Sequence, residues 1–520
     1  MSKAHFSSKK WSTIGVAMAG TLAAGTASAA FVGVLITNVP NASVAVGETT
    51  TVISPKYALQ RLAVGTDPIE NPSGVITTYG NLSTGVATEP DENLYLDFPG
   101  TLAGPTAGYN YGHHFLFQGH ENSANLAYLT RINLDVKDPA HRITLLSPVD
   151  SVTGLTGFNS VDGSTYDPFS GTLLFTQEAG ANGGVIQATV GFPSVINTLD
   201  GIVGKGGFEG IHPDDRGNLM IVEDAGGTSV NVIQGDATSA KTAKQPNSFV
   251  YRFVPSNPAN LAAGGKLQAL QVSIDGAPLK FNAADPVGDV FAPAQVKLHT
   301  VGSTWPAQWI TVHDTAVDGT ASFSANAAAK AAGATPFKRP ENGVFQPGTG
   351  FHRFYFDVTG DTDNTSGSQP ELAARGAWGA IFRLDVSSSS NSAVLSAFFL
   401  GDAAHAAFDN LTFADELTLT ATEDRGDTLH DQLNALDSVW AFSTCGLVHP
   451  RRFIALGRDA IAAPLGAEDN EPTGLFVSEG ATDLAHMQGR FLNPLTARAF
   501  VTQQHGLNQT FEIVLTRPHF

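Results

Sequence analysis

The chain has 520 residues, of which 42% are hydrophobic and only 15% are charged, and it contains 54 glycines and 28 prolines. So few charges exclude a coiled coil, and so large an apolar share excludes a wholly disordered chain. The net charge of -19 argues against a surface that binds nucleic acid; solubility, cation binding and salty surroundings remain as explanations of the acidity. The composition favours many short strands joined by Gly and Pro turns. The one cysteine, Cys445, excludes internal disulfide bonds, and we expect it to be a small buried thiol.

The first 29 residues predict a secretory signal peptide. Three lysines give a basic start, residues 14–25 form an apolar run, and Ala27-Ser28-Ala29 supplies the small side chains of a cleavage site. Cleavage after Ala29 would leave residues 30–520 as a periplasmic or extracellular protein. No later stretch of the sequence is apolar for long enough to be a transmembrane helix, so we expect no membrane partner.

Six later segments share one pattern, in which an apolar strand ends in acidic or amide residues. Most of them are followed by a second segment of high strand propensity. Six such repeats over about 480 residues predict an all-β fold, a six-bladed β-propeller. An array of β-sandwiches and two all-β domains are the alternatives. The six strands run to His120-Glu121, Gln177-Glu178, Glu223-Asp224, Asp361, Glu423-Asp424 and Gln504-His505.

Residues 254–338 form the largest irregular stretch of the chain. Ala325 to Ala332 is rich in alanine and is followed by Gly333, a pattern typical of a helix and its C-terminal end. We therefore expect a partly helical insertion over one end of the propeller, within a single domain that spans residues 30–520.

Three acids at the starts of segments precede a later acid by similar intervals. The interval is 15 residues for Glu209 and Asp224 and for Asp409 and Asp424, and 20 residues for Glu341 and Asp361. Because the innermost strand of each propeller blade lines the central channel, the earlier acids should converge at one mouth of that channel. Carboxylates that lie together need a cation to stay ionised, and oxygen ligands suit Ca²⁺, Mg²⁺ or ferric iron. The alternative is that these acids cap turns or bond to neighbouring blades.

Other chemical motifs are weak or missing from the sequence. His113, His114 and His120 cluster before Glu121, but without the His-Glu-x-x-His spacing of a zinc peptidase, so we expect them at a strand end or a turn. No Gly-rich phosphate loop, Gly-x-Ser-x-Gly elbow or dinucleotide fingerprint occurs in a convincing context. Nucleophilic serine chemistry is therefore not supported.

Six short motifs are spread along the mature chain. The longest, residues 328–341, is an Ala-rich run that leads into Arg339-Pro340-Glu341. The others are Gly119-His120-Glu121-Asn122, Thr172 to Glu178, Gly207-Phe208-Glu209, Asp409-Asn410-Leu411 and Gln504-His505-Gly506. Together they resemble the motifs of the PhoX-type alkaline phosphatases, over most of the mature chain.

This resemblance implies a propeller whose channel mouth holds calcium and iron ions and hydrolyses phosphate monoesters. Position by position, it implies that Arg339 and Arg452 grip the phosphate, as guanidinium groups do well. It also implies metal ligands at Glu178, Glu209, Asp224, Glu341 and Asp409. The expected function is thus that of a secreted, metal-dependent phosphatase, a monomer that acts on small-molecule phosphate esters.

One position departs from the family pattern. The family has an iron-ligating cysteine where this chain has Ser160, and a hydroxyl is a poorer ferric ligand than a thiolate. Asp162 is the substitute that the sequence offers. Iron is therefore in question, while calcium remains expected. Two other functions stay open: a calcium-stabilised binding propeller without catalysis, and a different propeller hydrolase, such as a lactonase or a phytase-like enzyme.

Overall fold

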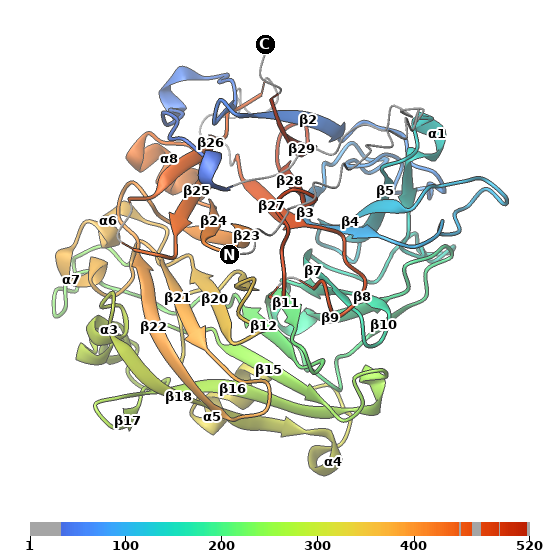
Figure 1. Cartoon of the computed structure of the whole chain (residues 1–520). Helices are drawn as coiled ribbons and strands as arrows, with labels where there is room; N and C mark the ends of the chain where they lie inside the picture. The colour runs from blue at the N-terminus through green and yellow to red at the C-terminus, as the bar shows by residue number, and fades with distance from the viewer. Residues whose placement is uncertain (1–32, 447–448, 460–469, 488, 517–520) are drawn as a thin grey trace, which may run out of the picture.

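Strands dominate the computed structural model, which describes residues 33–446, 449–459, 470–487 and 489–516. The expected signal peptide, residues 1–29, lies outside these residues. None of the helices described is both long enough and apolar enough to cross a membrane. The sheets are arranged around a central axis (Figure 1).

Most strands belong to antiparallel sheets in which strands consecutive in the chain pair with each other. One sheet contains β3 (Glu89–Asp97), β4 (His114–Glu121), β5 (Tyr128–Asn133) and β6 (Ile143–Leu145). The next contains β7 (Val161–Asp167), β8 (Thr172–Gln177), β9 (Gly184–Ala188) and β10 (Ile196–Thr198). A five-stranded sheet contains β23 (Phe408–Asp415), β24 (Thr418–Glu423), β25 (Ser438–Ser443), β26 (Arg451–Ala455) and β1 (Val52–Ile53). A further sheet contains β27 (Pro472–Ser478), β28 (Arg498–Gln503), β29 (Gln509–Leu515) and β2 (Tyr57–Ala63).

A ten-stranded sheet contains two more groups of this kind. The first is β11 (Phe208–Pro213), β12 (Leu219–Glu223), β15 (Val250–Pro255) and β16 (Gly265–Ile274), with β17 (Ala277–Pro278) beside β16. The second is β19 (Gly343–Phe345), β20 (Arg353–Val358), β21 (Ala380–Asp385) and β22 (Ser392–Leu400). β18 (Thr304–Asp314) joins them, because it pairs with β16 on one side and with β22 on the other. β13 (Ser229–Val230) and β14 (Ala243–Lys244) form a small separate sheet.

The innermost strands form a closed ring. β3, β7, β11, β19, β23 and β27 contact one another in this order, and β27 contacts β3. The N-terminal strand β2 completes the last sheet by pairing with β29, so strands from the two ends of the described chain close the ring. This arrangement confirms the prediction of an all-β propeller. The count of six blades stays a prediction, because β18 merges two of the strand groups into one sheet.

The stretch predicted to be an irregular insertion, residues 254–338, contributes two long strands. β16 has 10 residues and β18 has 11, and β-branched and aromatic side chains such as Trp309 and Ile310 suit such strands. The predicted helix is α5 (Ala325–Ala332); Ser324 caps its first turn, and Gly333, with φ 77°, ends it. The other α-helices are α1 (Pro139–Arg142), α2 (Pro286–Phe291), α3 (Pro293–Leu298), α4 (Thr315–Asp318), α6 (Asn364–Gly367), α7 (Pro370–Ala373) and α8 (Gly426–Leu433).

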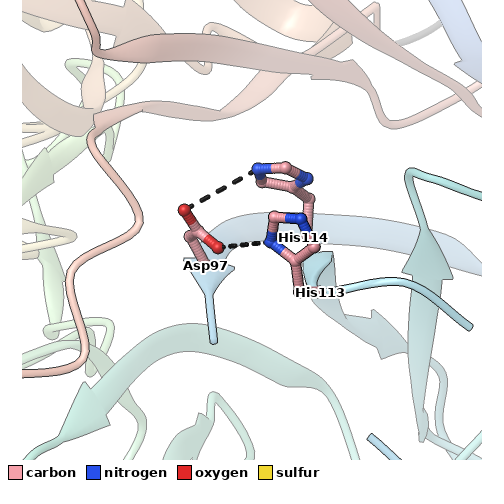
Figure 2. Close-up of side chains that lie close together, drawn as sticks. All are labelled: Asp97, His113 and His114. Atoms are coloured by element: carbon pink, nitrogen blue, oxygen red, sulfur yellow. Dashed lines mark hydrogen bonds and ion pairs between the residues drawn. The ribbon is translucent and has the colours of Figure 1, made fainter. Parts of the chain in front are cut away.

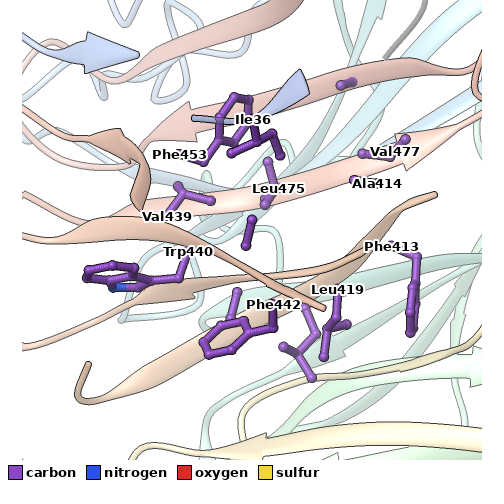
Figure 3. Packing of buried hydrophobic residues seen from close by; sticks show 14 of the residues in the cluster. Ile36, Phe413, Ala414, Leu419, Val439, Trp440, Phe442, Phe453, Leu475 and Val477 are labelled. Atoms are coloured by element: carbon purple, nitrogen blue, oxygen red, sulfur yellow. The ribbon is translucent and has the colours of Figure 1, made fainter. Parts of the chain in front are cut away.

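Apolar side chains fill the space between neighbouring sheets. In the cluster of Figure 3, Phe413 and Leu419 of the five-stranded sheet lie with Leu475 and Val477 of the next sheet, and all four are buried. Each such side chain stabilises the fold by about 1.5–3 kcal/mol relative to exposure. Cys445 takes no part in this core: it is exposed in the turn after β25, so the expectation of a buried thiol is wrong.

Candidate metal centre

Five innermost strands carry a β-bulge close to their first residue. Their pairing with the second strand shifts register between Pro90 and Asn93, Val161 and Ser164, Phe208 and Ile211, Phe408 and Leu411, and Thr473 and Phe476. A bulge takes residues out of regular pairing and re-aims their side chains. Asp91, Asp162, Glu209 and Asp409 all lie within these bulges, and all four are buried.

Further acids reach the same end of the propeller. Because paired strands are antiparallel, the end of each second strand lies beside the start of the innermost strand. Glu121 ends β4, Glu178 follows β8, and Asp224 follows β12. Glu341 lies two residues before β19, at the entry to the next innermost strand.

The side chains that meet at this end form what we call the acidic arc: Asp91, Glu121, Asp162, Glu178, Glu209, Asp224 and Glu341. It consists of three overlapping groups, in each of which one ligand atom per residue lies within 4.8 Å of the others. The groups are Asp91, Glu121 and Asp162, then Asp162, Glu178 and Glu209, then Glu209, Asp224 and Glu341. Because neighbouring groups share Asp162 and Glu209, the arc is continuous from β3 to the start of β19.

Burial and mutual repulsion make the arc costly to ionise. Burial raises the pKa of Asp162, Glu178 and Glu209 well above the usual carboxyl range, and nearby carboxylates raise it further. Burial, followed by the charge of Asp224, raises the pKa of Glu341 to about 7. Asp224 Oδ1 is buried and accepts no hydrogen bond from the described residues. A bound cation would supply the positive charge that these carboxylates need.

Arg339 brings a positive charge to one end of the arc. Its Nε donates to Asp224 Oδ2 at 2.8 Å, and its Nη2 lies 3.4 Å from Glu341 Oε1. Burial works against the charged form, but Asp224 and Glu341 hold the pKa of Arg339 above its ordinary value. Its φ of 55° is in the left-handed region, which costs energy for a residue other than glycine. The side chain is 24% exposed, and its contacts with the two carboxylates fix the direction of the guanidinium.

The structure brings four of the five predicted metal ligands into the arc, namely Glu178, Glu209, Asp224 and Glu341. Asp409, the fifth, is buried nearby but belongs to none of the three groups. Its carboxylate accepts from Asn410 Nδ2 at 3.0 Å and from Thr422 Oγ1 at 3.2 Å. Burial, followed by the charges of Asp91 and Glu341, raises the pKa of Asp409 well above its usual value, so its charge is coupled to the arc.

Arg452 lies on β26 and is held by contacts other than the arc. Its Nε donates to Ser438 Oγ at 3.0 Å, and its guanidinium lies 4.4 Å from the centre of the Trp440 ring. Burial lowers the pKa of Arg452. These contacts tie it to the outer strands of the five-stranded sheet, and the structure does not bring it together with Arg339.

Asp91 and Glu121 are missing from the predicted ligand set, and Asp162 is predicted only as a substitute for the family's cysteine. A signal for Asp162 is the glycine that follows it, since Asp162-Gly163 repeats the pattern of Glu209-Gly210. A Cβ atom on Gly163 would lie 2.2 Å from the carbonyl oxygen of Glu209, so the glycine lets two innermost strands approach closely. Asp91 is followed by Glu92 and carries no such signal.

Ser160, at the position of the family's cysteine, supports the arc through its backbone. Its carbonyl oxygen accepts from the Glu178 N–H at 2.9 Å, and its own N–H donates to Asn122 O at 3.0 Å. The three groups of the arc contain only carboxylates, and an all-oxygen donor set suits calcium better than a softer ion. The arc therefore fits calcium and lacks the thiolate that the resemblance implies for iron.

Comparisons with known proteins add a family and a likeness of fold. Residues 230–505 match the family described as alkaline phosphatase PhoX. This region contains Glu341 of the arc, with Arg339, Asp409 and Arg452, whereas the six other arc residues precede it. A search of curated proteins gives no match.

Two solved structures are similar at low sequence identity. Regucalcin from Agrobacterium tumefaciens, described as a calcium-binding protein, is 11% identical and has a TM-score of 0.26, with 69% of this chain and 92% of that chain covered. The PQQ-bound form of aldose sugar dehydrogenase from Streptomyces coelicolor is 12% identical and has a TM-score of 0.26, with 73% of this chain and 95% of that chain covered. Likeness at this level does not bear on what the present chain binds.

Proposed function

The chain belongs to the PhoX alkaline phosphatase family, and on that premise we propose that it is a secreted, metal-dependent hydrolase of small-molecule phosphate monoesters. The acidic arc carries the proposal, because it gathers seven carboxylates at one end of the ring with an arginine beside them. Hydrolysis of a phosphate ester needs positive charge around the phosphoryl group and a group that orients it. A cation site next to a guanidinium supports both.

Calcium fits the donor set of the arc. Asp162 and Glu209 each belong to two of the three groups, so they would contribute to neighbouring ion positions. When bound, the metal would polarise phosphate oxygens and lower the pKa of a bound water. Asp224 Oδ1 is buried without a hydrogen-bond partner among the described residues, so its lone pairs are free to bind the metal.

The chain's own side chains would bind and orient the substrate. Arg339 offers a planar set of N–H donors to phosphate oxygens, and its contacts with Asp224 and Glu341 fix the direction of that set. The close strand approach at Gly163 holds neighbouring carboxylates in place before substrate arrives. Little reorganisation is then needed as charge develops during the reaction.

Replacing Glu341 with Gln tests the proposal directly. Glu341→Gln keeps the size of the side chain but removes one carboxylate from the third group of the arc, so metal content and turnover should both fall. The measurements are elemental analysis of the purified protein and hydrolysis of a chromogenic phosphate ester. Glu416→Gln, at an exposed position, is the matched control and should change neither. Wild-type protein that is fully loaded with calcium, yet inert towards the ester, contradicts the proposal.

A calcium-stabilised binding propeller without catalysis is the second candidate function. Two observations favour it: Ser160 stands in place of a thiolate ligand, and Arg452 does not reach the arc. A panel of phosphate esters, phytate and lactones separates the two candidates, and also detects a lactonase or a phytase-like enzyme. Protein that carries calcium alone and turns over none of these compounds is the result expected of a binding propeller.

Export belongs to the same proposal. Removal of the signal peptide after Ala29 should give a monomeric mature protein that begins at Ala30, in the periplasm or the medium. Mass spectrometry of the protein recovered from these fractions measures its N-terminus. A cytoplasmic protein that retains residues 1–29 is the contrary result.

A further inference from the structure

A second group of candidate ligands lies at the opposite end of the first sheet from the acidic arc. Asp97 ends β3, His113 and His114 lead into β4, and Asp97 is the register partner of His114. Glu121, the arc residue on β4, is seven residues from His114, which is about 23 Å along a strand. The group is thus separate from the arc and does not depend on the proposed function.

The three side chains converge on a common point, as Figure 2 shows. His113 Nδ1 lies 2.8 Å from Asp97 Oδ1, and His114 Nε2 lies 3.7 Å from Asp97 Oδ2. One ligand atom from each of the three residues lies within 4.8 Å of the others. In a tetrahedral zinc site, with bonds of about 2.0–2.1 Å, ligand atoms lie about 3.3 Å apart. The separations are therefore close to those of a metal site.

A fourth residue, Asp135, sets the tautomer of His114. Asp135 Oδ1 lies 2.9 Å from His114 Nδ1, and Asp135 Oδ2 accepts from the backbone N–H of His113 at 2.8 Å. Because a carboxylate only accepts hydrogen bonds, His114 Nδ1 carries a proton towards Asp135, and by the same rule His113 Nδ1 carries one towards Asp97 that a bound ion would displace. The Nε2 of a neutral His114 then presents a lone pair. A carboxylate that orients a metal-binding histidine in this way is a common feature of zinc sites.

The backbone makes room for Asp135. Gly112 has φ 78°, and a Cβ atom there would lie 2.3 Å from the Asp135 side chain. The position therefore needs glycine both for its conformation and for the approach of the carboxylate.

The gap between His114 and Asp97 is one that a cation would fill. His114 Nε2 faces Asp97 Oδ2 at 3.7 Å, too far for a direct hydrogen bond, and an ion bound between them would contact both atoms. We propose that Asp97, His113 and His114 bind a divalent transition-metal ion between them, with Zn²⁺ the ion of best fit. Two imidazoles and one carboxylate are the donors that such ions prefer, whereas calcium favours oxygen alone.

Charge and exposure agree with this assignment. The carboxylates of Asp97 and Asp135 together balance the charge of a dication next to neutral histidines. The side chains of His113, His114 and Asp97 are 50%, 28% and 43% exposed, so a further coordination position faces solvent. An ion can enter without any movement of the fold.

Copper serves as a spectroscopic probe of this site and zinc as its competitor. The full chain is stripped with a chelator and reloaded with calcium, so that the acidic arc keeps a hard ion. One equivalent of Cu²⁺ should then give an electron paramagnetic resonance spectrum with coupling to imidazole nitrogen, and a large excess of Zn²⁺ should displace it, because Cu²⁺ binds such donors more tightly. The arc cannot give this signal, because its groups contain only oxygen donors. Wild-type protein without nitrogen coupling overturns the proposal.

Variants assign the signal to residues. His113→Ala and His114→Ala should each remove one of two coupled nitrogens, and Asp135→Asn should weaken copper binding by about 10–100-fold while both couplings remain. His352→Ala is the matched control, because His352 is an exposed histidine whose Nδ1 lies 3.3 Å from the backbone oxygen of Val386, away from Asp97. Coupling to two nitrogens that survives in either ligand variant, affinity that is unchanged in Asp135→Asn, or a changed spectrum in His352→Ala contradicts the assignment. Thermal melts of each variant show that it is folded.

Discussion

At the scale of single residues, Arg339 and Arg452 show how far a motif can predict a role. The resemblance implies phosphate binding for both. In the structure Arg339 faces two arc carboxylates, whereas Arg452 stacks on Trp440 in the outer strands of its sheet. A guanidinium takes its role from the groups that surround it, and those groups come from distant parts of the chain. The sequence therefore shows that an arginine stands at each position, but it does not show which groups surround that arginine in the fold.

The two arginines should respond differently to replacement by alanine. Arg339→Ala removes donors that would contact the phosphoryl group, so we expect kcat/KM for a phosphate ester to fall by about 10²–10³-fold with little loss of calcium. Arg452→Ala removes a partly buried stacking contact with Trp440, so we expect a loss of stability of about 1 kcal/mol with kcat/KM unchanged. Steady-state kinetics and urea unfolding measure the two effects. Equal kinetic losses in both variants would contradict the placement of Arg452 outside the site.

At the scale of elements, the bulge at the start of the innermost strands accounts for Asp91, Asp162 and Glu209 in the arc. Acids at strand ends, such as Glu178 and Asp224, could be predicted because apolar strands precede them. Asp91 could not, because its strand begins Glu89-Pro90-Asp91-Glu92 and lacks an apolar start. β18 was not distinguished from irregular chain for a related reason: what defines it is pairing with β16 and β22, which are far from each other in sequence.

Gly163, in the innermost strand β7, should be required for the geometry of the arc. In Gly163→Ala the new Cβ atom would meet the Glu209 carbonyl oxygen at 2.2 Å, so the strands must separate. We expect a loss of stability of about 1–3 kcal/mol, together with a lower calcium content. Gly191→Ala is the control, because a Cβ atom there meets nothing within 4 Å. Denaturant unfolding and elemental analysis give the comparison, and equal effects of the two substitutions would be contrary to expectation.

At the scale of the whole molecule, the closed ring concentrates negative charge at one end. From the sequence, the all-β class and the convergence of acids could be predicted, since both follow from repeated local patterns. The contact of β27 with β3 and the pairing of β2 with β29 could not, because they join segments more than 350 residues apart. The separate histidine group depends on the same kind of information, since only the pairing of β3 with β4 places Asp97 beside His114.

The charge at this end should make stability depend on pH in the metal-free protein. Burial raises the pKa of Glu341 to about 7 in the folded state, against about 4.3 for an ordinary glutamate. Between these values the folded chain holds more protons than the unfolded chain, so stability falls as pH rises. With the metal chelated, Tm should be higher at a pH of about 5 than at about 8, and calcium should raise Tm more at the higher pH. Differential scanning calorimetry with and without chelator tests this, and a metal-free Tm that rises with pH would contradict it.

The strand β18 has a mechanical consequence for the ring. In a propeller, neighbouring strand groups contact each other mainly through side chains. Each boundary between two groups is therefore a place where the ring can open. At one of these boundaries the backbone of β18 pairs with both β16 and β22, so hydrogen bonds join the two strand groups. Glu209 and Glu341 belong to the two strand groups that β18 joins, and both belong to the third group of the arc. On heating, the ring should therefore open first at boundaries that lack such pairing. The third group of the arc should keep its geometry to the highest temperature.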